Sequence, residues 1–97
     1  MSVVVVGGND RMATRYKEVC KAHKCKAKVF IKMPADFESK LGCPDLVIVL
    51  TDTVSHKMVH TVNQKAGRGE FDVAHVHSSS ISALKNVLAQ YCCSLSS

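Results

Sequence analysis

Residues 45–60, DLVIVLTDTVSHKMVH, decide the fold of this chain. The unbroken apolar run Leu46–Leu50 is too short for a solvated helix and is rich in β-branched residues. A strand that is apolar on both faces is typical of the middle of a parallel sheet covered by helices. Polar residues follow it from Thr51 onward, at the carboxyl end of the predicted strand, where open α/β sheets bind ligands. This stretch therefore predicts a central strand, a binding edge and an amphipathic helix.

The rest of the chain repeats this alternation of short strands and helices. Strands are predicted at residues 2–6, 26–31, 46–50 and 71–76, and helices at 11–24, 36–41, 54–66 and 81–91. Lysines alternate with apolar residues in the second strand, which indicates an edge position. Right-handed crossovers make strand order 2-1-3-4 the economical one. We therefore predict an α/β, three-layer Rossmann-like or flavodoxin-like sandwich with a four-stranded parallel sheet.

The length and composition predict one domain in the cytoplasm. A chain of 97 residues has room for one modest core, so residues 1–97 are expected to form a single α/β domain, with 94–97 as a frayed tail. No apolar run approaches the roughly 20 residues that span a bilayer, and MSVVVVGG lacks the features of a signal peptide. With five cysteines and no secretory signal, reduced thiols are favoured over a disulfide framework.

Positive charge is concentrated in one segment. Between residues 11 and 32 the only acid is Glu18, against eight basic residues: Arg11, Arg15, Lys17, Lys21, Lys24, Lys26, Lys28 and Lys32. Such a segment can steer an anionic partner, nucleic acid included. Only Tyr16 and Phe30 are aromatic among these cations, however, and two isolated rings do not form the interleaved pattern that stacks on bases. A solvated helix face is therefore favoured over a nucleic-acid interface.

Three predicted loops should converge on one edge of the sheet, because each connects the carboxyl end of a strand to the start of a helix. The switch point between the first and third strands places a crevice beside Gly7 and Thr51. Backbone N–H groups at helix starts bind phosphates and carboxylates, and the hydroxyls and Arg11 would add to them. The alternative is that these residues are turn glycines and helix caps only. The candidate ligand-binding residues are Gly7, Gly8, Asn9, Arg11, Thr51, Asp52, Thr53, Ser55, His56, His77, Ser79 and Ser80.

The histidines suggest a different kind of site, for a metal ion or haem. His56 and His60 are four residues apart on one predicted helix, with His56 expected one turn inside it. His75 and His77 alternate along the fourth strand. The two pairs would form such a site only if their elements met, and H-K-M-V-H lacks the glutamate of a zinc-protease helix. Individually, each is more simply a partly buried histidine with a backbone partner.

Catalysis is less favoured than binding. Asp52 with His56, or Ser55 with His77, would suit acid–base or nucleophilic chemistry. Such residues are common at the loop edges of α/β domains, and the sequence has no nucleophile elbow, Walker loop or dinucleotide fingerprint. We therefore expect a non-enzymatic sensor or adaptor that binds a small anionic or phosphate-bearing ligand and needs no cofactor.

Four segments resemble a bacterial family, domain of unknown function 2325. They are VVVVGG (3–8), KMPADFE (32–38), PDLVIVLTDTVSHKMV (44–59) and HSSSISALKNVL (77–88), and T-D-x-V-S-H at 51–56 is the specific part. The resemblance implies a Rossmann-like sandwich and no known activity. Many relatives carry a histidine, a small acidic or glycine run and a glutamate after the second strand, where this chain has residues 31–34, IKMP. No role for those groups is transferred.

A homodimer is also expected. A small sheet of four strands leaves the second and fourth strands with open edges, which invite pairing or coverage. Tyr91, Cys92 and Cys93, at the end of the last predicted helix, would supply apolar contact area.

Overall fold

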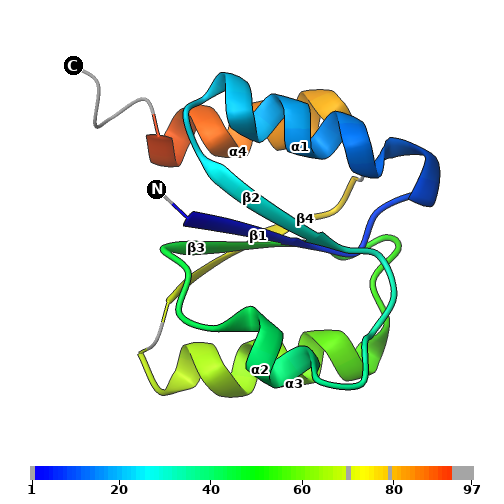
Figure 1. The fold of residues 1–97 in the computed structure, drawn as a ribbon, viewed down its shortest axis with the longest axis vertical. Helices are drawn as coiled ribbons and strands as arrows, with labels where there is room; N and C mark the ends of the chain where they lie inside the picture. Colours follow the sequence, from blue (N-terminus) through cyan, green and yellow to red (C-terminus); the bar gives the residue numbers. More distant parts are fainter. Residues whose placement is uncertain (1, 70, 79, 93–97) are drawn as a thin grey trace.

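A computed structural model describes residues 2–69, 71–78 and 80–92. It confirms the predicted α/β fold, with four parallel strands in the order β2-β1-β3-β4 (Figure 1). The predicted tail at 94–97, Cys93 and Ser79 lie outside the described residues. The strands are β1 (Ser2–Val6), β2 (Lys26–Phe30), β3 (Leu46–Leu50) and β4 (Asp72–Val76), and the helices are the 3-10 turn η1 (Asp10–Met12), α1 (Ala13–Ala22), α2 (Phe37–Leu41), α3 (His56–Gly67) and α4 (Ile81–Cys92).

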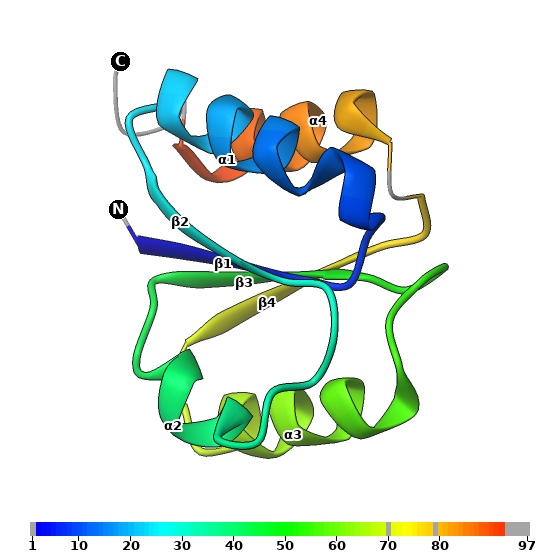
Figure 2. The ribbon, with the colours of Figure 1, turned by 45° about the vertical axis from the view of Figure 1, so that its right-hand side comes forward.

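The sheet forms the middle of three layers. Helices α1 and α4 cover one face, and α2 and α3 cover the other (Figures 1 and 2). Each face has its own apolar cluster, with Leu84 of α4 buried on the first and Met58 of α3 on the second. All five residues of β3 have 0% of their surface exposed, as the apolar run predicted. Because β1 connects outward to β2 and β3 lies on its other side, the switch point falls between β1 and β3.

The predicted first helix is divided into a 3-10 turn and an α-helix. The side-chain oxygen of Asn9 accepts from the Arg11 N–H at 3.0 Å, and the Asn9 carbonyl accepts from the Met12 N–H at 2.9 Å. This i→i+3 bond winds the first turn tightly, so α1 begins only at Ala13. The prediction of one α-helix from residue 11 was therefore wrong at its start, because Asn9 caps a 3-10 turn.

The buried cysteines behave as apolar side chains. Cys20 and Cys25 are buried free thiols, and Cys43 is an exposed one. Burial, with a smaller contribution from Cys25, raises the pKa of the Cys20 thiol to about 11. Cys20 therefore stays protonated at neutral pH and packs as part of the core on the α1/α4 face.

Lysine occupies a position at the end of α1 that suits glycine. The Cys25 N–H donates to the Cys20 carbonyl and the Lys24 N–H to the Lys21 carbonyl, both at 2.9 Å, which is the Schellman pattern. Lys24 has a φ of 59°, the only positive φ among the described non-glycine residues. A left-handed conformation costs such a residue about 1–2 kcal/mol.

We expect Lys24→Gly to raise the free energy of unfolding by about 0.5–1 kcal/mol, after the entropy cost of glycine is subtracted. Lys21→Gly is the matched control, because Lys21 lies inside α1. It should lower the free energy of unfolding by about 1 kcal/mol. Urea denaturation compares the two variants, and a loss of stability in Lys24→Gly would contradict the expected strain.

Among residues 2–69, 71–78 and 80–92, no helix combines the length and apolarity that crossing a bilayer requires.

Candidate functional site

The loops after β1, β3 and β4 lie at one edge of the sheet, on the right of Figure 1. We call residues 7–11, 51–56 and 77–80 of these loops the carboxyl rim; Ser79 within it is not described. From the sequence, His56 was expected one turn inside its helix. In the structure α3 begins at His56, so this exposed residue is the first of the helix, and that expectation was wrong. The fold therefore places the described candidate residues along a common edge, as the strand order requires.

One hydrogen bond joins the β1 and β3 loops across the switch point. The Gly8 N–H donates to the Thr53 hydroxyl oxygen at 2.6 Å, and the Thr53 hydroxyl donates to the Leu50 carbonyl at 3.3 Å. Thr53 thus accepts from a loop N–H group of the kind an anion would use. The expected crevice is bridged at this point by the protein's own side chain.

Gly7 and Gly8 are needed for packing within the protein. Their φ angles are +94° and +97°. A Cβ at Gly7 would lie 3.0 Å from the Leu50 carbonyl oxygen, and one at Gly8 would lie 2.6 Å from Tyr16 Cε2. The close approach that these glycines permit is therefore to Tyr16 and the β3 loop.

A second contact joins the β3 and β4 loops. The Thr51 N–H donates to the Val76 carbonyl at 2.8 Å, which continues the ladder beyond the strands. The Thr51 hydroxyl oxygen lies 3.1 Å from His77 Nδ1 and 3.2 Å from the Val76 carbonyl oxygen. Because the hydroxyl carries one proton, it either donates to Val76 and accepts from Nδ1–H, or donates to Nδ1. Either arrangement fixes the exposed His77 ring beside Thr51.

The described serines of the rim cap helices or turns. Ser55 accepts from the Met58 N–H at 3.3 Å and caps α3. Ser80 accepts from the Ala83 N–H, and Ser78 accepts from the Ser80 N–H, both at 3.2 Å. The capping alternative considered for these residues is thus realised for Ser55 and Ser80, and for Asn9 at η1.

The two histidine pairs considered for a metal or haem site do not come together in one cluster. His56 and His60 lie on α3, whereas His75 belongs to β4 and His77 follows it, and all four side chains are exposed. Within the part of the chain that the structure describes, no group of three or more histidine, cysteine, aspartate or glutamate side chains is placed to hold a metal ion.

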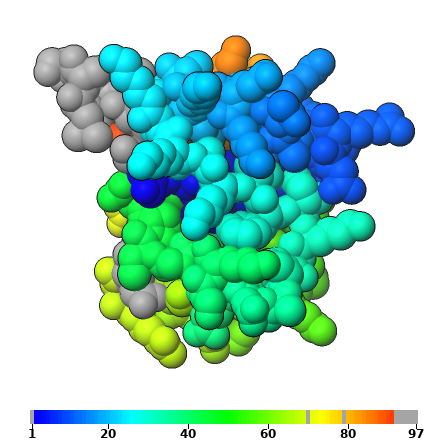
Figure 3. Space-filling view, viewed as in Figure 1, coloured from blue at the N-terminus to red at the C-terminus, as the bar shows by residue number. Residues whose placement is uncertain are grey.

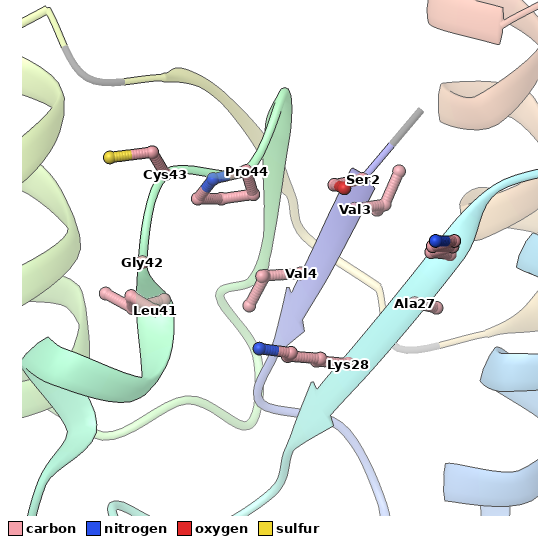
Figure 4. Close-up of a pocket in the computed structure, with 10 residues that line it drawn as sticks. Ser2, Val3, Val4, Ala27, Lys28, Leu41, Gly42, Cys43 and Pro44 are labelled. Atoms are coloured by element: carbon pink, nitrogen blue, oxygen red, sulfur yellow. The ribbon is translucent and has the colours of Figure 1, made fainter.

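The structure also contains a cavity that the sequence did not predict. Its volume is about 290 Å³, and it lies at the amino halves of β1 and β2, away from the carboxyl rim (Figure 4). Its lining residues are Ser2, Val3, Val4, Lys26, Ala27, Lys28, Leu41, Gly42, Cys43 and Pro44. The shortness of the predicted second helix was the available signal, because about two turns cannot cover the whole of an edge strand.

A second hollow, of about 360 Å³, runs along the outer side of β2, which lies between α1 and α2 in Figure 3. Lys17 of α1, Lys28 of β2 and Lys40 of α2 line it.

The strand order makes β2 and β4 the edge strands of the sheet, as the homodimer prediction requires. These lysines would repel a second copy at β2. Dimerisation stays a prediction, and β4 is the more suitable edge for it.

The fold and the carboxyl rim define a small parallel α/β domain whose helices begin along one polar edge. The chain belongs to a family described as an uncharacterised protein conserved in bacteria, domain of unknown function 2325, whose profile matches residues 2–91. No curated protein and no solved structure matches the chain.

Proposed function

We propose that this protein is a non-enzymatic sensor or adaptor domain that binds a small, phosphate-bearing anion at its carboxyl rim. The observation that carries the proposal is the continuity of the rim. Gly8 bonds to Thr53, and Thr51 contacts His77, so polar groups from three loops form one connected row. Helices η1, α3 and α4 all begin along this row.

Electrostatics supports an anionic ligand. Helices α3 and α4 each have 12 residues and point their N-termini toward the rim, which gives this edge partial positive charge. The exposed Arg11 adds a full positive charge. Asp10 and Asp52 oppose it with negative charge. The net charge of the chain, +5, still favours the approach of an anion.

Inorganic phosphate is the probe for this proposal. We expect phosphate to raise the melting temperature above that in chloride of equal ionic strength, because it binds the folded state only. His56→Ala should leave the phosphate-free melting temperature almost unchanged, because the side chain is exposed. It should nevertheless weaken phosphate binding by roughly tenfold or more, which corresponds to the loss of one charge-assisted hydrogen bond.

His60→Ala is the matched control, because His60 is an exposed histidine one turn further along α3. It should change neither the melting temperature nor phosphate binding. Equal phosphate affinity in His56→Ala and the unmodified protein, or a large loss of stability in His56→Ala, would refute the assigned role. Stoichiometric metal or a Soret band in freshly purified protein would favour the histidine site instead.

A further inference from the structure

Two lysines occupy positions where a covered strand would carry apolar side chains. On the face of the sheet that α2 and α3 cover, β2 contributes Lys26, Lys28 and Phe30, which pair in register with Ser2, Val4 and Val6 of β1. Phe30 packs edge-on against Phe37 of α2, with ring centroids 5.3 Å apart. Lys26 and Lys28 remain exposed on the same face. The face is therefore covered at one end of β2 and open at the other.

The open end results from the length of α2. This helix has five residues, and Phe37 and Leu41 are the two that it buries. Gly42, with a φ of 59°, then turns the chain toward Cys43 and β3. Coverage stops at this turn, which leaves the cavity of about 290 Å³ between β2 and the segment 41–44. In Figure 4 the Lys28 side chain extends from β2 toward Val4 and Leu41.

The cavity combines apolar walls with positive charge. Val4, Leu41 and Pro44 are buried residues that contribute apolar surface to it. Lys26 and Lys28 add two ammonium groups, and none of its described lining residues carries a carboxylate. Asp45 lies next to the lining, and its carboxylate accepts from the Ser2 N–H at 2.7 Å. Apolar walls with a few polar groups are typical of sites for small organic ligands.

We infer that this cavity binds a small organic anion. The apolar body of the ligand would pack against Val4, Leu41 and Pro44, and its acidic group would lie between the ammonium groups of Lys26 and Lys28. Lys17 and Lys40, in the adjoining hollow along β2, strengthen the local positive potential. This site is independent of the carboxyl rim, because it lies at the opposite ends of the strands.

Benzoate is a suitable probe, with benzamide as its uncharged isostere and acetate as an anion without an apolar body. In ¹H–¹⁵N NMR titrations of the whole chain, we expect benzoate to shift the amides of Val4, Leu41 and Gly42. Benzamide and acetate should bind roughly tenfold more weakly, because each lacks one of the two contributions. Lys26→Gln and Lys28→Gln should each weaken benzoate binding severalfold, and both side chains are exposed, so the variants should fold.

Lys32→Gln is the matched control, since this exposed lysine follows β2 and does not line the cavity. It should leave benzoate binding unchanged. The inference is overturned if millimolar benzoate does not shift these amides, if benzamide binds equally well, or if binding survives replacement of both Lys26 and Lys28. The lysines would then serve to protect the sheet edge. Phosphate binding at the rim should be the same in all of these variants, so the two proposals fail separately.

Discussion

Gly8→Ala is expected to lower the free energy of unfolding by about 2–5 kcal/mol. The new Cβ would lie 2.6 Å from Tyr16 Cε2 and 3.0 Å from both the Tyr16 hydroxyl oxygen and Leu50 Cδ1. Tyr16 and Leu50 are fully buried, so they have little room to move. The φ of +97° adds the strain of a conformation that alanine rarely adopts.

Urea denaturation measures this loss, and Gly69→Ala separates its two causes. Gly69 also has a positive φ, of 77°, but a Cβ there would meet no atom within 4 Å. Gly69→Ala should therefore cost only the conformational part, about 1 kcal/mol. If both variants lose the same stability, the Tyr16 ring moves aside, and the contact with Gly8 does not restrain the β1 loop.

The sheet could be predicted because its signals are local. The run Leu46–Leu50 is apolar on both faces, which is required only of a strand with neighbours on both sides and helices above and below. The second signal is the alternation of lysines with apolar residues in β2. It indicated an edge strand, because charged side chains at an edge can reach water. Given right-handed crossovers, these two assignments leave few strand orders.

The contacts within the rim could not be predicted, because they depend on tertiary structure. Thr53 accepts from Gly8, 45 residues earlier in the chain, and no local pattern indicates that pairing. A hydroxyl that caps a helix also has the same sequence signature as one that could bind an anion, as Ser55 illustrates. The sequence therefore located the edge but could not separate groups used within the protein from groups available to a ligand.

The cavity was missed for a related reason. Lys26 and Lys28 were correctly placed on an edge strand, but an edge lysine is expected in water whether or not a hollow lies beneath it. The hollow depends on where α2 stops relative to β2, which is set by the turn at Gly42. The position of that turn relative to β2 depends on tertiary structure, whereas the glycine in the sequence indicates only that a helix ends there.

The contrast between centre and edge predicts different costs for the same substitution in neighbouring strands. Val5 of β1 and Val29 of β2 are paired in register, and both pack on the α1/α4 face. Val5 is also paired with Ile48 and has 0% of its surface exposed, whereas Val29 is partly buried. Val5→Ala should therefore lower the free energy of unfolding by about 2–3 kcal/mol, and Val29→Ala by about 1 kcal/mol or less.

Urea denaturation at several protein concentrations tests this difference. In a monomer, or in a dimer formed through β4, both losses should be independent of concentration, and Val5→Ala should remain the more costly variant. A Val29→Ala loss as large as that of Val5→Ala, and growing with protein concentration, would mean that a second copy covers β2. The repulsion expected among Lys17, Lys28 and Lys40 at that edge would then have been overcome, and the cavity beside β2 would lie at a subunit interface.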